Sequence, residues 1–234
     1  MRILVTGARG ALGIEICSQL ERYDIDFLRF SHFMNLDDIE WESVTHIINC
    51  AAVIPNVNES FKSYWSGNVN FVNELIKYSK NKKFIHFSSL SQQYKFEEYQ
   101  ITKLLGSNLL VCNNHIFSSL QIIPIPTLED KSLINFLAGK SKSEKITVDR
   151  LRYNFIEITI LAELVVQSIQ KNERVNVVKS YVKKDLYEEV KLKNNSENLI
   201  EGVVIDRTSV NDHLITFSPH LFNEVLKITP YVSN

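Results

Sequence analysis

The sequence of 234 residues has no excess of charge of either sign, since 26 Lys and Arg residues face 27 Asp and Glu residues and the formal net charge is −1. Proteins that gather nucleic acid or an anionic membrane need a basic surface, so this balance argues against both partners. The chain also lacks an apolar run near the roughly 20 residues of a membrane-spanning helix, and its start lacks the apolar segment of a signal peptide. We therefore expect a cytoplasmic protein of one domain, or of one domain and a small lobe.

Cysteine and histidine are too few and too scattered to predict a metal site. The three cysteines, Cys17, Cys50 and Cys112, form no CxxC or similar spacing, so buried reduced thiols are expected. The six histidines show no paired spacing of the kind that binds zinc. We therefore expect no bound metal ion.

Glycine is scarce as well, with seven residues in the whole chain, yet three of them lie within the first thirteen positions. They fall in Thr6–Gly13, between an apolar run at Arg2–Val5 and a helical spacing of apolar residues at Ala11–Leu20. In such a strand, turn and helix, the glycines permit a tight turn, let the backbone approach a pyrophosphate, and bring helix and strand together. The helix amino terminus adds N–H groups and a partial positive charge. This context predicts a dinucleotide-binding turn.

The alternation of strand and helix continues to about residue 125. The expected strands are Ile25–Phe30, Thr45–Cys50, Lys83–Phe87 and His115–Ile123, and the expected helices are Tyr64–Ser79 and Glu97–Val111. This order predicts an α/β fold, a Rossmann-like doubly wound parallel sheet covered by helices on both faces. Ligands of such sheets bind at the carboxyl ends of the strands, so we expect the chemistry there.

The pattern weakens after Pro124 and Pro126, which we expect to break the last of these strands. The expected later elements are helices at Ser132–Ala138 and Thr159–Gln170, a strand at Val175–Val178, and a solvated helix and loop over Lys183–Asn198. We predict a dinucleotide-binding core over residues 1–125. Residues 126–234 are predicted to form a small, reduced substrate-binding lobe interleaved with the last core elements.

The end of the second expected strand bears on the choice of cofactor. NAD sites usually place an Asp or Glu there to bind the ribose 2′-hydroxyl, whereas this chain has Arg29, Ser31 and His32. These three residues, with Arg9 of the glycine turn, are suited to neutralise or hydrogen-bond a 2′-phosphate. We therefore prefer NADP as the cofactor and keep NAD as the alternative.

Tyr99 and Lys103 are spaced i and i+4, which places a phenol and an ammonium on one face of a helix. A free tyrosine titrates near 10, too high for efficient proton transfer at neutral pH, and a nearby cation lowers that pKa. The spacing alone is common on amphipathic helices. Its value comes from the serines of Ser88–Ser91, which follow the preceding strand, and from the glycine turn upstream. Together these groups predict a hydroxyl, a phenol and an ammonium beside a nicotinamide.

These motifs resemble the extended short-chain dehydrogenase/reductases, the family of nucleotide-sugar epimerases, dehydratases and 4-ketoreductases. Thr6–Gly13 matches the family's TGxxGxxG turn and Tyr99–Lys103 its YxxxK motif; Ile47–Ala52 resembles its strand with an NAA-type ending. The helix at Asn68 resembles the one that bears its structural asparagine, and Phe87–Ser89 resembles the strand that delivers its catalytic Ser or Thr. The resemblance is continuous over about residues 2–125 and looser beyond.

The resemblance implies roles for residues of this sequence. Tyr99 exchanges a proton with the substrate oxygen, Lys103 lowers the pKa of Tyr99 and binds the nicotinamide ribose, and Ser89 hydrogen-bonds the substrate oxygen. Ser91 is the second choice for the catalytic serine, and Arg152 lies in a segment that resembles the nucleotide-sugar side. The expected cofactor-binding residues are Gly7, Arg9, Gly10, Ala11, Leu12, Gly13, Arg29, Ser31, His32, Asn35, Leu36, Ala51, Ala52, Val53, Asn68, Tyr99 and Lys103. Asn35 stands where the family often has an Asp that contacts adenine.

The neighbourhood of Ser89 helps to choose the reaction. The family's 4,6-dehydratases follow their catalytic Thr with an Asp-Glu pair, whereas Leu90 and Ser91 follow here, so a dehydratase is disfavoured. We expect NADPH-dependent reduction of the 4-keto group of a nucleotide-linked deoxysugar. The alternatives are reduction of another small ketone or aldehyde, an epimerase with retained NAD, and a non-catalytic NADP-binding regulatory protein. In the family, the helices corresponding to Tyr64–Ser79 and Glu97–Val111 form a four-helix interface, which implies a homodimer.

Overall fold

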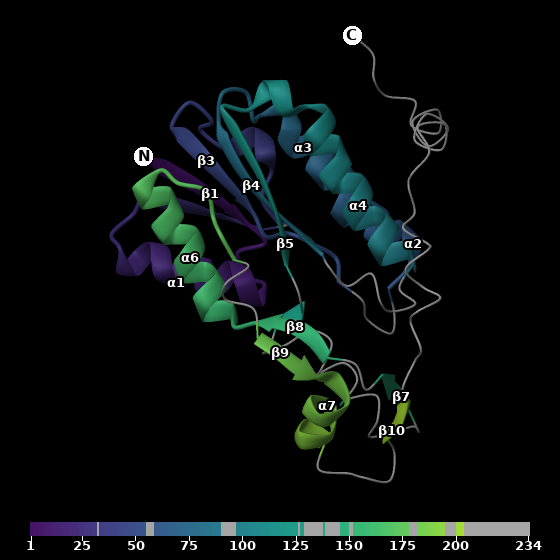
Figure 1. Cartoon of the computed structure of the whole chain (residues 1–234). Coiled ribbons are helices and arrows are strands. Elements are labelled where there is room, and N and C mark those ends of the chain that lie inside the picture. Colours follow the sequence, from purple (N-terminus) through teal and green to yellow (C-terminus); the bar gives the residue numbers. More distant parts are fainter. Residues whose placement is uncertain are drawn as a thin grey trace.

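A computed structural model describes residues 1–31, 33–54, 59–89, 97–125, 127–128, 138, 146–149, 152–177, 182–194 and 200–203. Five parallel strands form the central sheet, in the spatial order β2-β1-β3-β4-β5 (Figure 1). Their bounds are β1 Arg2–Thr6, β2 Phe27–Phe30, β3 Val44–Asn49, β4 Lys83–Ser89 and β5 Ser119–Ile125. β1 is a nearly continuous apolar run, and β3 and β4 are buried over most of their length, as expected of parallel strands covered on both faces. The predicted doubly wound parallel sheet is confirmed.

The order of the strands fixes where a ligand can bind. β2 lies on one side of β1, and β3 and the later strands lie on the other. The direction in which the chain winds therefore reverses between β1 and β3. In open α/β sheets the crevice at such a reversal, outside the carboxyl ends of the strands, is the usual ligand site.

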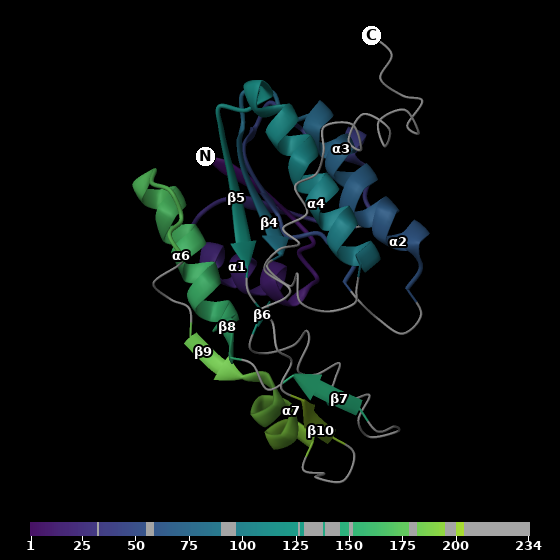
Figure 2. The same cartoon turned by 45° about the vertical axis from the view of Figure 1, so that its right-hand side comes forward.

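Two layers of helices cover the sheet. α1 (Ala11–Arg22) and α6 (Ile158–Lys171) pack side by side on one face, while α2 (Phe61–Trp65), α3 (Phe71–Lys77) and α4 (Glu97–Cys112) cover the other (Figure 2). Each layer has its own apolar core. On the α1 and α6 face the buried side chains include Ile16, Leu20 and Leu161, and on the other face they include Leu75, Phe84 and Leu110.

The helix expected over Tyr64–Ser79 is a longer helical segment with an irregular centre. α2 and α3 are joined without a break by the π-helical turn η2, Ser66–Asn70. Ser60 caps the start, since its hydroxyl accepts a hydrogen bond from the Ser63 N–H at 3.2 Å. A π turn inside an α-helix often marks a functional position, and this one contains Asn68.

The last strand of the sheet runs past the proline that was expected to end it. β5 continues through Pro124, which is paired with Ser88 of β4, to Ile125. β5 is an edge strand, so the absent N–H of Pro124 removes no hydrogen bond to a further strand. The expected break at this position is therefore wrong.

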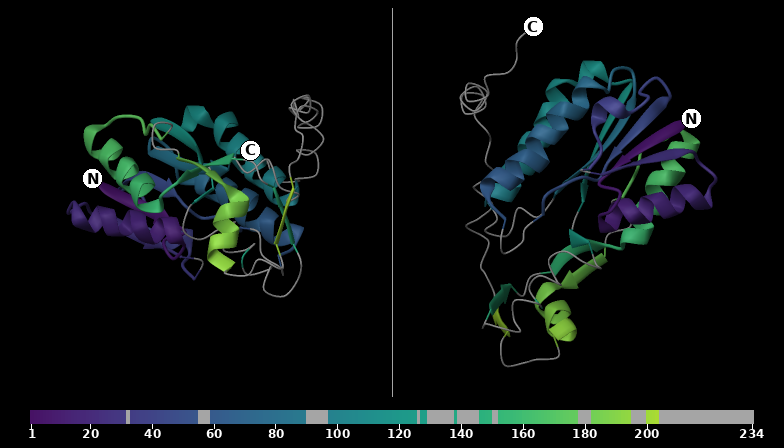
Figure 3. Two further views of the ribbon diagram at one scale, coloured as in Figure 1. Left: turned by 60° about the horizontal axis from the view of Figure 1, so that its bottom comes forward. Right: turned by 180° about the vertical axis from the view of Figure 1, so that it is seen from behind.

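Apart from α6, the chain after β5 forms smaller elements beyond the carboxyl ends of the sheet strands (Figure 3). β6 (Thr127–Leu128), β8 (Arg152–Ile156) and β9 (Val182–Asp185) form a three-stranded sheet, and β7 (Ile146–Asp149) pairs with β10 (Ile200–Val203). α7 spans Leu186–Asn194, so the segment predicted as a solvated helix and loop begins instead as a strand. The division into domains at residue 125 stays a prediction.

Two other sequence expectations for this region have different outcomes. The expected strand at Val175–Val178 is wrong for its described residues, because residues 175–177 are not in a strand. The side chain of Gln121 holds this segment: its amide N–H donates to the Val175 carbonyl at 2.8 Å, and its oxygen accepts from the Val175 N–H at 3.1 Å. The helix expected over Ser132–Ala138 lies outside the described residues except for Ala138.

No helix in the part of the chain that the structure describes is long and apolar enough to span a bilayer.

Candidate functional site

The glycine turn packs directly against the segment that follows β3. Gly7 has a φ of +62°, and a Cβ atom there would lie 2.6 Å from the Ala51 nitrogen. A Cβ atom at Gly13 would lie 2.2 Å from the Gly7 carbonyl oxygen. These close approaches are possible only because glycine has no side chain. The turn therefore packs directly against the segment after β3, and α1 starts directly against the turn, at the point where the winding of the sheet reverses.

The amino terminus of α1 suits an anionic ligand. Gly10 caps the helix without a side-chain hydrogen bond, and the first turn holds no acidic residue. The helix dipole and the N–H groups of the first turn therefore favour a negative group. A side chain at Gly7 would fill the cradle formed with Ala51, so the residues present fit the pyrophosphate of a dinucleotide. Leu12, predicted to bind the cofactor, has its side chain buried in the core.

The two arginines expected at a 2′-phosphate lie in different surroundings. The Arg29 guanidinium pairs with the Glu21 carboxylate at 2.6 Å and lies over the Phe27 ring, 5.4 Å from its centroid. The Arg9 guanidinium lies 5.7 Å from the centroid of the Phe33 ring, just after β2. Arg9 of the glycine turn is thereby brought to the end of the second strand.

The pairing of Arg29 bears on its predicted contact with a 2′-phosphate, which stays a prediction. No carboxylate stands at the end of β2, but Glu21 of α1 reaches Arg29 from eight residues earlier in the chain. Arg29 is therefore engaged by an acidic side chain on the α1 face, and Arg9 is the better placed of the two for a phosphate near β2. Ser31 forms a turn in which its carbonyl accepts from the Met34 N–H, and His32 lies outside the described residues.

Asn35 and Leu36 both have structural partners. The Asn35 side-chain oxygen accepts a hydrogen bond from the Asp37 N–H at 3.2 Å and caps the short helix η1, Leu36–Asp38. The Leu36 carbonyl accepts from the Trp41 indole at 2.8 Å. These contacts shape the loop after β2.

Asn68 acts as a clamp on the loop after β3. Its side-chain oxygen accepts from the Val53 N–H at 2.9 Å, and its NH₂ group donates to the Val53 carbonyl at 3.1 Å and to the Thr102 hydroxyl at 3.2 Å. A Cβ atom at Gly106 would lie 2.1 Å from the Asn68 carbonyl oxygen, so α4 approaches the π turn closely. Asn68 was predicted to bind the cofactor; the structure directs its amide to the chain itself, where it holds Val53 in place.

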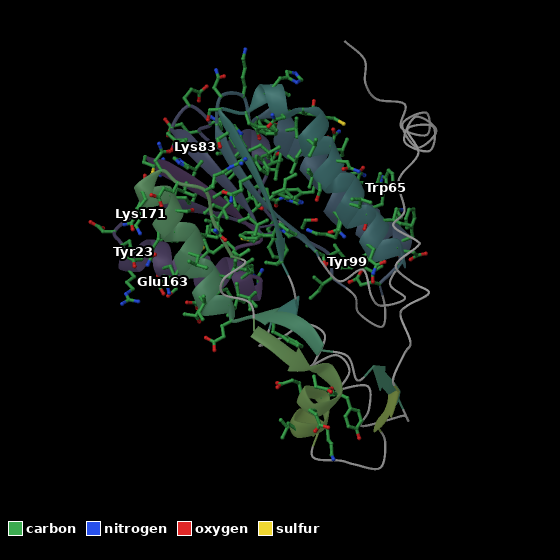
Figure 4. The ribbon with its side chains drawn as sticks, in the orientation of Figure 1. Tyr23, Trp65, Lys83, Tyr99, Glu163 and Lys171 are labelled. Atoms are coloured by element: carbon green, nitrogen blue, oxygen red, sulfur yellow. The ribbon has the colours of Figure 1, made fainter. Side chains whose placement is uncertain are left out.

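Tyr99 lies near the amino-terminal end of α4, at the carboxyl edge of the sheet (Figure 4). Its hydroxyl forms a side-chain hydrogen bond with Ser89. Its ring packs edge-on against the Tyr64 ring, with the ring centroids 6.0 Å apart. Burial raises the pKa of Tyr99 to about 12, although the hydrogen bond with Ser89 opposes this rise. In this state Tyr99 carries its proton at neutral pH, as a proton donor must.

The geometry distinguishes the serines that the sequence left open. The Ser88 hydroxyl accepts a hydrogen bond from the Ser107 hydroxyl of α4 at 3.1 Å, whereas Ser89 reaches Tyr99. Both partners belong to α4, and only Ser89 is the partner of Tyr99. Ser89 is thus favoured. Ser91 and the Arg152 side chain lie outside what the structure describes.

Lys103 lies one helical turn beyond Tyr99 and is buried. Its ammonium donates a hydrogen bond to the Phe87 carbonyl at 2.7 Å. Burial lowers the pKa of Lys103 to about 8, with the thiol of Cys50 opposing the shift. The ammonium therefore lies at the end of β4, and because burial raises the pKa of Tyr99, the lowering of that pKa expected from Lys103 is not seen.

Lys103 makes the stability of the protein depend on pH. Because its pKa falls from 10.5 unfolded to about 8 folded, the unfolded chain binds more protons between these values, and stability rises with pH there. Relative to Lys103→Met, the wild type should gain about 2 kcal/mol between about pH 7 and about pH 9.5. Urea unfolding of both proteins measures the difference, and parallel pH profiles would contradict the burial of the ammonium.

One buried polar group near this edge was missed from the sequence. Thr6, Asn49 and His86, from β1, β3 and β4, are joined side chain to side chain, and each is at most 1% exposed. The lack of paired histidine spacing argued against a metal site and indicated no role for His86. The available signal was a polar residue in an otherwise apolar strand.

Among the described residues, no group of three or more His, Cys, Asp or Glu side chains is placed to hold a metal ion.

Comparisons with known proteins agree with this geometry. The sequence profile described as the NAD dependent epimerase/dehydratase family matches residues 3–110. A search of curated protein sequences finds no match to the chain.

Solved structures share the fold over most of the chain at low identity. UDP-glucuronic acid 4-epimerase from Bacillus cereus, in complex with NAD, is 16% identical with a TM-score of 0.66, over 94% of this chain and 92% of that one. dTDP-4-dehydrorhamnose reductase from Bacillus anthracis, in complex with NADP, is 15% identical with a TM-score of 0.63, over 88% and 85%. A hypothetical dTDP-4-dehydrorhamnose reductase from Sulfolobus tokodaii is 18% identical with a TM-score of 0.62, over 89% and 88%.

Proposed function

Residues 3–110 place the amino-terminal half of the chain in the NAD dependent epimerase/dehydratase family, and from this we propose that the protein is an NADPH-dependent ketoreductase. Its proposed substrate is a nucleotide-linked deoxysugar, reduced at the 4-keto group. The family match confirms the resemblance that the motifs indicated. The choice of reaction and substrate is our inference from the site.

The contact between the hydroxyls of Ser89 and Tyr99, with the buried Lys103 one helical turn further along α4, is the observation that carries the proposal. In a reduction, the ketone oxygen gains negative charge as hydride arrives at the carbon, and a proton must reach that oxygen. Tyr99 holds a proton at neutral pH because its pKa is raised to about 12. Ser89 is within reach of the same hydroxyl, so a carbonyl oxygen placed between the two can accept from both.

The chain's residues have distinct tasks in this proposal. A bound NADPH, held at the glycine turn, would supply the hydride. Tyr99 donates the proton to the developing alkoxide, and Ser89 orients the carbonyl. Lys103 holds positive charge beside Tyr99, which stabilises the phenolate left after proton transfer. Gly7 and Gly13 keep the turn free of side chains, so the backbone can contact phosphate.

The proposed reaction predicts consumption of NADPH, followed by its near-ultraviolet absorbance, in the presence of a panel of nucleotide-linked 4-keto sugars. The alternatives give different results. An epimerase would convert a nucleotide sugar to its epimer without net consumption of a nicotinamide, as judged by NMR of the product. A regulatory binder would bind NADPH tightly and turn over no member of the panel. A reductase of simple ketones would act on small substrates without a nucleotide.

The preference for NADP is proposed to rest on Arg9. Replacing Arg9 with Ala should weaken NADPH binding by about 10- to 100-fold, the value of one or two hydrogen bonds to a charged group, with little change for NADH. Arg29→Ala is the matched control, because Arg29 is paired with Glu21 and should affect NADPH less. Isothermal titration with both cofactors measures the ratio. Loss of the preference in Arg29→Ala alone would reverse the assignment.

A homodimer is part of the same proposal. α4 exposes apolar side chains on the face turned away from the sheet, among them Ile101, Leu104 and Val111. An apolar helix face of this kind is suited to packing against its copy in a second chain.

A further inference from the structure

The side chains of Thr6, Asn49 and His86 form a hydrogen-bonded three-strand bridge. In the sheet register, Asn49 of β3 pairs with Thr6 of β1 on one side and with His86 of β4 on the other. The bridge therefore crosses three strands on one level, where β1 and β3 end. The cofactor loops begin at the next residues, Gly7 and Cys50.

The orientation of the Asn49 amide is fixed by a backbone donor. Its side-chain oxygen accepts from the Thr6 hydroxyl at 2.6 Å and from the Ala51 N–H at 3.3 Å. A backbone N–H can only donate, so the atom that faces Ala51 must be the amide oxygen. The NH₂ group of Asn49 is left facing His86.

This orientation determines the tautomer of His86. The Asn49 NH₂ nitrogen lies 3.1 Å from Nδ1 of His86, and an amide NH₂ can only donate. Nδ1 is therefore the acceptor and carries no proton, so the neutral ring carries its proton on Nε2. A charged ring would set an N–H against the amide N–H, in a buried place next to the Lys103 cation. Both burial and Lys103 keep the pKa of His86 well below its usual value.

A buried histidine donor without a hydrogen-bond partner is energetically unfavourable, and this cost supports a role for His86 beyond packing. Nε2 of His86 is buried and has no hydrogen-bond partner among the described residues. An apolar side chain of similar size would fill the same volume without leaving a donor for a buried water to satisfy. It would not, however, offer an acceptor to Asn49.

We propose that His86, fixed as the Nε2–H tautomer, is a positioning residue for the dinucleotide: it aligns Asn49, which ties the turn after β1 to the loop after β3. The proposal rests on the proposed function in so far as a dinucleotide is the ligand of that edge. The tautomer and the bridge themselves follow from the hydrogen bonds alone. Each part has its own measurement.

Nitrogen NMR of the ¹⁵N-labelled protein tests the tautomer without any ligand. We expect an unprotonated Nδ1 and a protonated Nε2 for His86, with shifts constant from about pH 6 to about pH 8.5, and the signal is assigned by its loss in a His86 variant. A protonated Nδ1, or titration in this range, would overturn the proposal.

NADPH binding by two variants tests the positioning role. His86→Phe removes the acceptor and should weaken binding about tenfold, the effect of one lost hydrogen bond, while His86→Gln keeps an acceptor oxygen and should stay within about threefold of the wild type. His46→Phe is the control, since His46 is buried on β3 at the opposite end of the strand, paired with Ile3 and Lys83. Equal affinities for Phe and Gln variants would overturn the positioning role.

The outcomes separate this proposal from the proposed function. If the wild type binds neither NADPH nor NADH, the proposed function fails and the dinucleotide role of His86 fails with it. If the wild type binds NADPH and His86→Phe binds it equally well, only the positioning role fails. If His86→Phe does not fold, the NMR measurement still tests the tautomer, and loss of NADPH binding in His86→Gln would overturn the positioning role.

Discussion

Tyr99→Phe should lower kcat for ketone reduction by about 10²- to 10⁴-fold, the usual contribution of a positioned general acid. The reason is that phenylalanine fills the same space beside Tyr64 but has no proton to give to the alkoxide. Ser89 and Lys103 remain, so the carbonyl can still be oriented and the cofactor can still bind. We therefore expect the NADPH affinity of the variant to stay within about threefold of the wild type, so that the loss appears in kcat and not in cofactor binding.

The measurement is a steady-state assay with the best substrate from the panel, together with a direct titration of NADPH. Tyr23→Phe provides the control, because this substitution removes the same kind of hydroxyl from a tyrosine at the far end of α1 (Figure 4). A Tyr99→Phe enzyme with wild-type kcat would show that the proton comes from another group. Equal losses in both variants would point to a general effect on folding.

Gly7→Ala should destabilise the fold by about 2–5 kcal/mol and abolish measurable dinucleotide binding. Two costs add: the left-handed φ of +62° is unfavourable for any residue with a Cβ, by about 1–2 kcal/mol. The added Cβ would also lie 2.6 Å from backbone nitrogen of Ala51, and such overpacking costs about 1–3 kcal/mol. To relieve this contact, the glycine turn must move away from the loop after β3. This movement disrupts the expected pyrophosphate site between Gly7 and Ala51.

Gly10→Ala is the matched control in the same turn. A Cβ atom at Gly10 would meet only the Gly7 carbonyl oxygen, at 3.3 Å, and the φ of Gly10 is −77°, which alanine adopts readily. We expect it to cost less than about 1 kcal/mol. Chemical denaturation of both variants gives the free energies of unfolding. Similar losses at Gly7 and Gly10 would contradict the close packing of the turn on Ala51.

Features that depend on contacts within a few residues could be predicted from the sequence, whereas features that depend on distant contacts could not. The glycine turn, the YxxxK spacing and the alternation of strand and helix are patterns within a few residues. The structure has the glycine turn where it was expected and the order of elements that was expected, although His115, expected to begin the last strand, lies in the short helix η3, Asn114–Ile116, ahead of β5. The expected strand at Val175–Val178 failed because a long-range contact, from Gln121, replaces strand pairing there. The expected break at Pro124 failed because its cost depends on whether the strand has a neighbour on that side.

The sequence by itself therefore determined the fold class and the residue types of the site, because local spacing and apolar periodicity specify elements and their order. The tertiary structure alone decided how these groups pair. It brought Glu21 to Arg29, Arg9 to Phe33, and Asn68 to the backbone of Val53.

The three-strand bridge is the clearest case of this division. Thr6, Asn49 and His86 are separated by 43 and 37 positions, so no local pattern relates them. They meet because β1, β3 and β4 are neighbours in the sheet at one register, and that register comes from the packing of the apolar strands against both helix layers. Hydrogen bonds inside such a core are directional, which is why the fold, rather than the sequence, assigns the proton on His86.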